Sequence, residues 1–335
     1  MRRSRKCGVA LLVLTAAFLF SAGVLQSQEP QTADTITIDT NLISVPVIVS
    51  DRDNRYVANL KVDAFHLFDN QIEQKISYFD TGEEPLNVVL MLDTSFSTSG
   101  VLDDIKKAAR EFLKDLRPQD RAMIVTFDWE VKKLSDLTND RRQLEDAVKH
   151  AKVGKYAGTL LNEALMDVST HVLQPIRGRK AIILLSDGED HGSVTNVDDL
   201  ITAESEGDAM IYSIYYRPEM QRMFGMPGRG GFPGRRHPFH HAMPQRPGRQ
   251  QGRPRHNEGF ELMQKLAEVT GGRFYQGETK ELKETFALIA EELRHQYRLG
   301  FYPEALKRDG AVHALLVKVN LPDVSVRSRH EYLAK

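Results

Sequence analysis

Two acidic residues follow wholly apolar runs of this chain. The run VVLML precedes Asp93, Ser95 and Ser97, and the run AIILL precedes Asp187, with one serine between. Two carboxylates brought together repel each other unless a cation lies between them, and hydroxyl groups add neutral oxygen ligands. An all-oxygen set suits Mg²⁺, Mn²⁺ or Ca²⁺ rather than zinc or copper. These residue types therefore predict a site for one divalent cation of this kind.

Short apolar segments alternate with amphipathic ones between residues 86 and 290, and these must position the candidate ligands. The uninterrupted apolar runs 88–92 and 181–185 fit strands buried on both faces, and segment 101–116 places its apolar residues on one helical face. The alternation predicts an α/β fold with a doubly wound, mainly parallel sheet. Ligands of such sheets bind beyond the carboxyl ends of the strands, so Asp93 and Asp187 would share a crevice if their strands are neighbours. The other expected strands are 123–127, 131–137, 210–216 and 273–275, and the other expected helices are 144–151, 160–173, 198–206, 260–270 and 282–293.

Three motif pieces, in order, give the chain a family resemblance. The segment DTSFS at 93–97 resembles the D-x-S-x-S motif of the metal-ion-dependent adhesion site in von Willebrand factor type A domains. That family also has a threonine in a later loop and an aspartate followed by glycine after the fourth strand. Thr159, after Gly158, and Asp187, before Gly188, stand in the matching places. The resemblance covers roughly residues 86–290 and implies the Rossmann-like fold of that family.

The resemblance also implies a role for each residue. Ser95 and Ser97 would donate hydroxyl oxygens directly to the metal, and Thr159 would ligate it directly or through water. Asp93 and Asp187 would act largely through bound waters. The remaining coordination position would receive the carboxylate of an Asp or Glu from a partner protein. The family usually has glycine between the two serines, whereas this chain has Phe96, whose ring would narrow access to the metal or offer a partner an apolar contact.

Apolar and β-branched segments flank the predicted domain on both sides. Residues 36–82 contain the run LISVPVIVS and an expected hairpin between 64 and 79, and residues 295–335 contain three further strand-like segments. Neither piece has enough strands to be stable alone, so we expect them to pair into one small flanking sheet that forms a small β domain. Both resemble the segments around the A domain in a bacterial exported subfamily. The predicted organisation is a leader at 1–28, a β segment at 36–82, the A domain at 86–294 and a β segment at 295–335.

The first residues have the pattern of a secretory signal. Four basic residues among the first six precede an apolar run from Gly8 to Leu25, and a polar stretch follows. This pattern predicts an exported protein of the periplasm, cell envelope or medium, with the segment either cleaved or kept as a membrane anchor. Cys7, the only cysteine, lies within this segment, so the remaining chain relies on neither disulfides nor a cysteine-type zinc site.

Residues 217–258 interrupt the alternating pattern. They contain seven Gly, seven Pro, nine Arg and only two acidic residues, a composition that predicts a disordered insertion. Clustered arginines can bind phosphates, but the segment has no Lys, Tyr or Trp, and we expect a solvated insertion rather than a nucleic-acid interface. The insertion follows the strand expected at 210–216, so it leaves the sheet at the metal edge. The histidines at 237, 240 and 241 could also take up a transition metal.

Several alternative interpretations remain open from the sequence. Asp93 and Asp187 could be helix caps, which often follow strands. The A domain could serve only as a scaffold for assembly of the cell envelope, with a non-essential metal site. A metal-dependent hydrolase is a third possibility, but the chain has no G-x-S-x-G elbow, P-loop or H-E-x-x-H motif. We therefore expect a metal-dependent, adhesion-type binding module that is not an enzyme.

Overall fold

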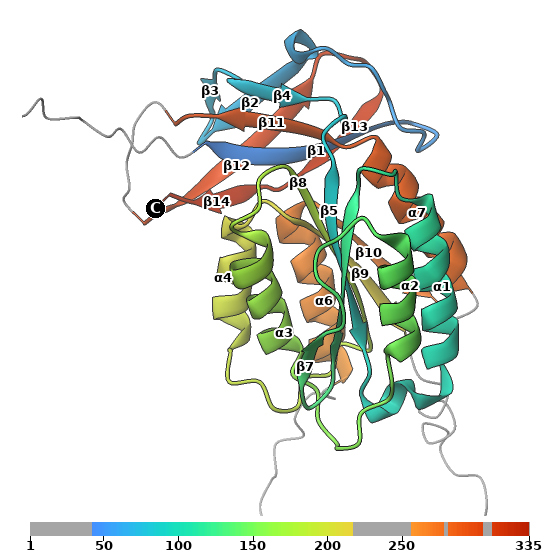
Figure 1. The fold of residues 1–335 in the computed structure, drawn as a ribbon. Coiled ribbons are helices and arrows are strands. Elements are labelled where there is room, and N and C mark those ends of the chain that lie inside the picture. The colour runs from blue at the N-terminus through green and yellow to red at the C-terminus, as the bar shows by residue number, and fades with distance from the viewer. Residues whose placement is uncertain (1–41, 217–255, 278–280, 304–309, 335) are drawn as a thin grey trace, which may run out of the picture. The chain divides into compact units, whose positions relative to one another are not determined.

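The computed structural model describes residues 42–216, 256–277, 281–303 and 310–334. Its largest sheet has six strands in the order β10-β9-β8-β5-β6-β7 (Figure 1). Five of these strands run parallel, and β7 pairs antiparallel with β6. The strands are β5 (Leu86–Asp93), β6 (Arg121–Phe127), β7 (Val131–Lys133), β8 (Arg179–Ser186), β9 (Met210–Tyr216) and β10 (Arg273–Gly277).

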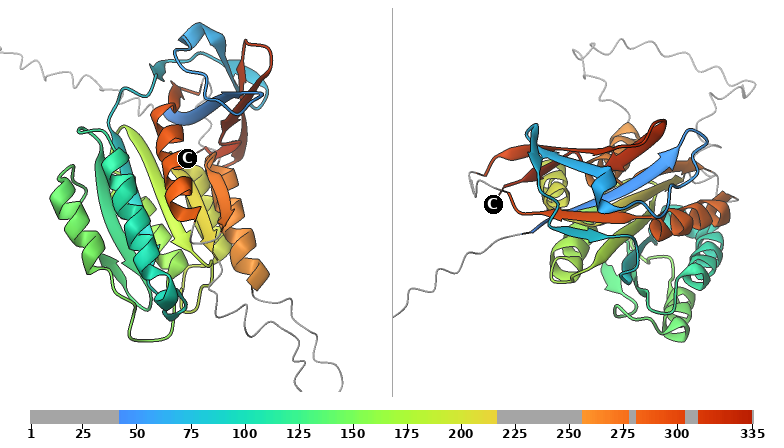
Figure 2. Two further views of the ribbon diagram at one scale, coloured as in Figure 1. Left: turned by 90° about the vertical axis from the view of Figure 1, so that its right-hand side faces the viewer. Right: turned by 90° about the horizontal axis from the view of Figure 1, so that it is seen from above.

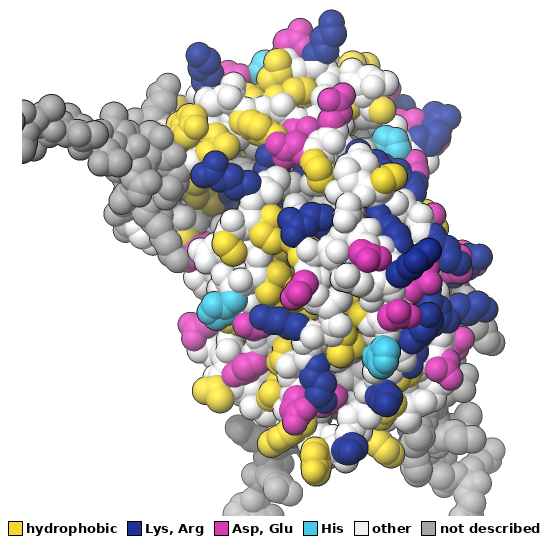
Figure 3. All heavy atoms as spheres, viewed as in Figure 1, with side chains coloured by type: hydrophobic (Ala, Val, Ile, Leu, Met, Phe, Trp, Pro, Cys, Tyr) yellow, Lys and Arg dark blue, Asp and Glu magenta, His cyan; other side chains and the backbone are white. Residues whose placement is uncertain are grey.

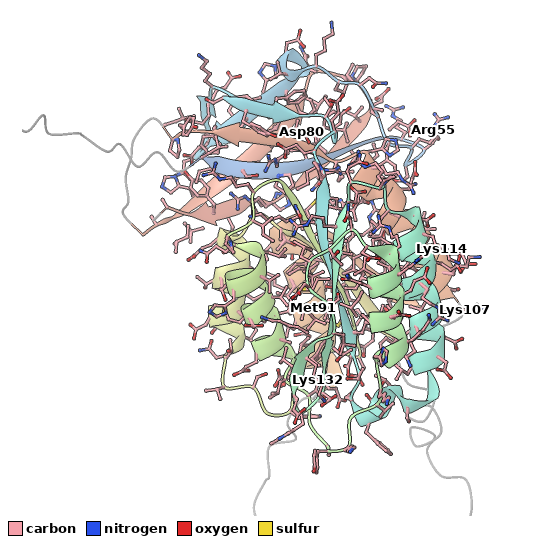
Figure 4. All side chains as sticks on the ribbon, viewed as in Figure 1. Arg55, Asp80, Met91, Lys107, Lys114 and Lys132 are labelled. Atoms are coloured by element: carbon pink, nitrogen blue, oxygen red, sulfur yellow. The ribbon has the colours of Figure 1, made fainter. Side chains whose placement is uncertain are left out.

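Helices cover both faces of this sheet, which explains its uninterrupted apolar strands (Figures 1 and 2). In β5, Val88 and Leu90 pack in one hydrophobic cluster, and Val89 and Met91 pack in the other. Met91 is labelled in Figure 4 on the central strand. The first cluster is completed by α1 (Leu102–Asp115), α2 (Arg141–His150) and α7 (Leu282–Arg294), and the second by α3 (Leu161–Asp167), α4 (Val197–Glu206) and α6 (His256–Thr270).

The predicted fold class is confirmed, and β5 and β8 are neighbours. Leu92 of β5 pairs with Leu185 of β8 in parallel register. From β5 the chain builds the sheet outward in one direction through β6, and in the other through β8, β9 and β10. The strand order therefore reverses between β5 and β8, and such a reversal is where open α/β sheets bind ligands.

Strands from both flanking segments form two further antiparallel sheets, with orders β13-β1-β11-β4 and β14-β12-β2-β3. Apolar side chains from both sheets share one hydrophobic core, with Val47 and Leu299 from the first and Leu67 and Val317 from the second. The strands are β1 (Ile43–Asp51), β2 (Phe65–Asp69), β3 (Ile72–Gln74), β4 (Tyr78–Asp80), β11 (Tyr297–Phe301), β12 (Val312–Val319), β13 (Val324–Ser328) and β14 (Glu331–Leu333). The segments thus pair as expected, but into two sheets rather than one.

The hairpin expected between residues 64 and 79 is shorter than predicted. Asn70 and Gln71 both have positive φ, as a two-residue hairpin turn requires, and they join β2 to β3. The chain then leaves this sheet, and β4 pairs with β11 in the other one. Ile76 and Tyr78 continue the partial alternation of the segment, so periodicity alone did not indicate that the chain changes sheets after β3.

Some element boundaries also differ from the sequence prediction. The helix expected at 160–173 is α3 followed by a π-helical turn over Val168–Leu173. Helix α6 begins at His256, so the last three residues of the predicted insertion are helical. The rest of that insertion and the predicted leader at 1–28 lie outside the described residues. Within the described ranges, no helix combines the length and apolar character needed to cross a membrane.

Candidate metal centre

The candidate ligands lie on three loops at the carboxyl edge of the central sheet. The first loop follows β5 and passes through a 3-10 turn at Phe96–Gly100. The second follows β8, and the third leads from α2 into α3. The edge follows from the topology, because parallel strands end at the same side of their sheet. It is the lower end of the sheet in Figure 1.

Asp93 is the last residue of β5 and is completely buried. Its Oδ1 accepts a hydrogen bond from the backbone N–H of Ser95 at 2.8 Å, and its Oδ2 accepts one from the Ser186 hydroxyl at 2.7 Å. Burial and the nearby charge of Asp187 raise the pKa of Asp93 to about 7, although these hydrogen bonds act in the opposite direction. The two carboxylates therefore lie close enough to repel each other, and a cation between them would relieve that repulsion.

Ser95 and Ser97 present their hydroxyl groups side by side. The two Oγ atoms are 2.9 Å apart and share a hydrogen bond. Adjacent oxygen ligands in an octahedral Mg²⁺ shell lie about 2.9 Å apart, whereas the longer bonds to Ca²⁺ give about 3.3–3.7 Å. The Thr98 hydroxyl donates to the Ser95 carbonyl at 2.7 Å and fixes this turn. The hydroxyl pair is thus close enough to supply two neighbouring ligands to one small cation.

Thr159 and Asp187 are both buried, and their loops are joined by hydrogen bonds. The backbone N–H of His191 donates to the Thr159 carbonyl at 2.9 Å, and that of Asn162 donates to Asp190 Oδ2 at 2.9 Å. Glu163 Oε1 accepts the backbone N–H groups of Val194 and Thr195 at 2.7 and 3.1 Å. The structure therefore brings the loop of Thr159 against the loop of Asp187, as a shared site requires.

The sequence did not point to Tyr216, the last residue of β9. Its side chain is buried, and its hydroxyl has no hydrogen-bond partner among the described residues. Burial, followed by the charges of Asp93 and Asp187, raises the pKa of this hydroxyl well above its ordinary value. A buried donor this close to two carboxylates can serve water or an anion at the site. Its position at the end of an apolar strand was the only available signal.

Trp129 supports the loop that carries Thr159. A Cβ atom on Gly158 would lie 2.4 Å from the indole ring, and one on Gly192 would lie 3.5 Å from it. Both glycines have positive φ, at 142° and 147°. The ring therefore packs directly over two glycine backbones, one beside Thr159 and one in the Asp187 loop. Half of the Trp129 side chain remains exposed.

The candidate centre is built mainly from hydroxyl groups. Across the part of the chain that the structure describes, no three His, Cys, Asp or Glu side chains are arranged as a metal site. Three of the five candidate residues are Ser or Thr, so the candidate ligands are mainly hydroxyl oxygens rather than a cluster of three such side chains. The residues present fit a hard cation through the spacing of Ser95 and Ser97, the Asp93–Asp187 pair and the available Tyr216 hydroxyl.

The structure is a doubly wound α/β domain with an oxygen-rich candidate site at the switch point. Residues 88–189 match the family model described as the von Willebrand factor type A domain. The chain therefore contains a von Willebrand factor type A domain, and the resemblance inferred from the motifs is confirmed. A comparison with curated proteins found no match.

Solved structures with a similar arrangement include two bacterial proteins and one from a mussel. Conserved hypothetical protein BatB from Bacteroides thetaiotaomicron is 17% identical, with 62% of this chain and 97% of that chain covered and a TM-score of 0.42. The vWF domain of the type V pili tip protein Mfa5 from Porphyromonas gingivalis is 13% identical, with 62% and 94% covered and a TM-score of 0.43. Proximal thread matrix protein 1 from the mussel byssus, with a zinc-occupied MIDAS motif, is 12% identical, with 67% and 49% covered and a TM-score of 0.46. This chain thus spans about half of the mussel protein, and similarities at this level do not transfer function.

Proposed function

We propose that this protein is an exported binding module that uses one divalent cation, Mg²⁺, to hold an acidic residue of a partner protein. Ser95, Ser97 and Thr159 would supply oxygen ligands, and Asp93 and Asp187 would balance the charge behind them. The observation that carries the proposal is the 2.9 Å spacing of the two serine hydroxyls beside the buried Asp93–Asp187 pair. Export is supported by the basic and apolar pattern of the first residues.

The chemistry of the site suits binding rather than turnover. When bound, the cation would supply an electrophilic position for an external carboxylate. The protein's own contribution is to fix the hydroxyl groups in advance through the turn at Thr98 and the joined loops of Thr159 and Asp187. Preorganised ligands lose little conformational entropy on binding, which favours affinity.

Exposed aromatic side chains surround this edge and characterise the partner further. Phe96 is 66% exposed and Tyr156 is 67% exposed, on the first and third loops, and Trp129 is half exposed beside them. Hydrophobic side chains are visible at this lower end of the molecule in Figure 3. Aromatic residues are enriched at protein interfaces. They suit a partner whose acidic residue has apolar neighbours.

Calorimetry with Mg²⁺ tests the metal step. We expect the wild-type protein to bind one Mg²⁺, and Ser95→Ala and Asp187→Ala to weaken binding by about 100-fold or more, because each removes a ligand or half of the charge balance. Asp136→Ala, which removes an exposed carboxylate from another loop, should bind like wild type. Equal affinity in all four proteins would refute a specific centre at this edge.

The partner step needs a separate measurement. Capture of envelope proteins on immobilised wild-type protein should require Mg²⁺, and it should be lost with EDTA and with Ser95→Ala. If capture survives both treatments, the alternative scaffold function is favoured. The exposed apolar residues Ile72, Val312 and Leu316 of the flanking sheets would then be the first surface to alter.

A further inference from the structure

A cavity opens beside the candidate metal centre, between the loop after β8 and the first turn of α6. Its volume is about 490 Å³, within the range of pockets that hold small organic groups. The loop contributes Glu189, Asp190 and His191, and the helix contributes Glu258. The metal centre uses none of these side chains, so the cavity needs its own explanation.

The lining of the cavity is acidic. It includes three carboxylates, and no Lys or Arg occurs among the described residues that line it. His191 Nε2 lies 2.8 Å from Glu189, so this histidine offsets one carboxylate at most. The positive end of α6 amounts to about half a unit charge, which cannot balance the remaining acidic groups. The cavity therefore favours a positively charged occupant.

Asn162 gives an independent sign of a missing ligand. Its side chain is 5% exposed and lines the cavity, and its Oδ1 has no hydrogen-bond partner among the described residues. Its Nδ2 donates to the Thr195 carbonyl at 3.1 Å, which fixes the orientation of the amide. A buried acceptor without a donor destabilises the fold, so an N–H group from a ligand would be stabilised here. The Asn162 amide oxygen and the nearby carboxylates together favour a ligand that carries a positive charge and donates hydrogen bonds.

A metal ion does not meet these requirements. No three acidic or histidine side chains converge as metal ligands in the described part of the chain, which includes this cavity. Both Asp190 oxygens already accept backbone N–H groups, from Asn162 at 2.9 Å and Ser193 at 3.1 Å. The cavity is also much larger than a single ion needs. A guanidinium or ammonium group on a side chain fills more of it and brings several N–H donors.

The helix that lines the cavity packs directly against the loop that carries Asp187. Gly188, next to Asp187, packs backbone to backbone against Gly259 of α6, where an added Cβ atom on Gly259 would lie 2.1 Å from the Gly188 carbonyl oxygen. We propose that this cavity binds a basic side chain, Arg or Lys, of the same partner whose carboxylate the metal holds. The link to one partner rests on the proposed function, whereas cation binding in the cavity does not.

Agmatine, which carries a guanidinium group, tests the cavity by NMR titration of the isotope-labelled full chain in EDTA. We expect saturable shifts of the backbone amides of Gly188, Glu189 and Gly259, and weaker binding of butylammonium at the same place. Glu258→Gln should weaken agmatine binding about five-fold, the size expected for one exposed ion pair, and Glu258→Arg should abolish it. Glu261→Gln removes an exposed charge from the same helix outside the cavity and should change nothing.

The contrary results are equally specific. Equal weakening by Glu258→Gln and Glu261→Gln would mean that only the overall charge matters, and saturable binding of butyrate at these amides would mean an anion site at the helix terminus. Either result overturns the proposal. Because the titration contains no metal, it can succeed if the Mg²⁺ centre fails and fail if that centre succeeds. Asn162→Ala should weaken agmatine binding as well, provided that its amide spectrum shows the wild-type fold.

Discussion

The two edges of the central sheet hold charged residues in opposite ways. At the amino edge, Arg179 begins β8, is 1% exposed, and donates to the carbonyls of Gly82, Glu84 and Leu293 and to the Gln296 side chain. At the carboxyl edge, Asp93 and Asp187 raise each other's cost of ionisation. The amino edge surrounds its charged side chain with carbonyl acceptors, whereas the carboxyl edge places two carboxylates close together.

The flanking sheets explain why the amino edge is self-sufficient. Arg327 of β13 donates to the buried Glu292 of α7 and to the carbonyls of Gly271 and Gly272, and Arg329 donates to the Gly207 carbonyl at 2.6 Å. Asp80, labelled in Figure 4 at this end, receives the Gly82 N–H at 3.0 Å. Buried arginines that serve several carbonyls fix one geometry, because each lost bond leaves an unpaired polar group. The amino edge is therefore held rigid by its own contacts, whereas the carboxyl edge is where we propose binding.

Removal of the Arg179 guanidinium should change the stability of the protein more than any other substitution considered below. Burial, followed by the charge of Arg117, already lowers the pKa of Arg179 to about 10, so the group is held at a cost. Arg179→Met would remove the side-chain donor of the Leu293 carbonyl and one of the two donors of the Gly82 and Glu84 carbonyls, which Arg117 also serves. It should lower the free energy of unfolding by about 4 kcal/mol. Urea denaturation followed by circular dichroism measures this. Arg177→Met, at an exposed position nearby, should leave the free energy of unfolding almost unchanged. Equal losses of stability in the two variants would show that the buried contacts of Arg179 do not stabilise the amino edge.

Glu204, a buried acid near the end of α4, should make the stability of the protein depend on pH. Burial raises its pKa from 4.5 to about 7, opposed by the Ser169 hydroxyl, which donates to it at 2.5 Å. Because the folded pKa exceeds the unfolded one, the stabilisation is complete below pH 4.5 and is lost as the pH rises through 7, by about 3 kcal/mol. In Glu204→Gln this loss should be absent.

Unfolding free energies of wild type and Glu204→Gln from pH 4 to 8 check that expectation, with the exposed Glu261→Gln as the control. The same series with Mg²⁺ tests whether the two edges are energetically coupled. Glu204 lies near the amino edge, next to the carbonyls that Arg329 holds, so Mg²⁺ should leave the Glu204 contribution unchanged. A contribution that disappears with Mg²⁺ would show that the two edges are coupled.

The sequence predicted the carboxyl edge better than the amino edge. Asp93 and Asp187 stand out because polar residues end uninterrupted apolar runs, and strand periodicity then places them on one side of a parallel sheet. The roles of Arg179 and Arg327 depend on carbonyl groups far away in the chain, which no local pattern marks. The acidic cavity depends in the same way on α6 meeting the Asp187 loop, although Glu189 and Asp190 were visible beside the motif.

The smallest effect tests the carboxyl edge with two adjacent tyrosines. Tyr215 and Tyr216 are both buried, and neither hydroxyl has a hydrogen-bond partner among the described residues. They point to opposite faces of β9, and burial, followed by the charges of Asp93 and Asp187, raises the pKa of Tyr216. Tyr216→Phe should weaken Mg²⁺ binding about three-fold, because it removes a donor for a group at the site, and Tyr215→Phe should not. Neither change should lower stability without metal, since each removes an unpaired polar group. Calorimetry that found equal Mg²⁺ affinity in both variants would place the ion away from Tyr216, and so away from the crevice between β5 and β8.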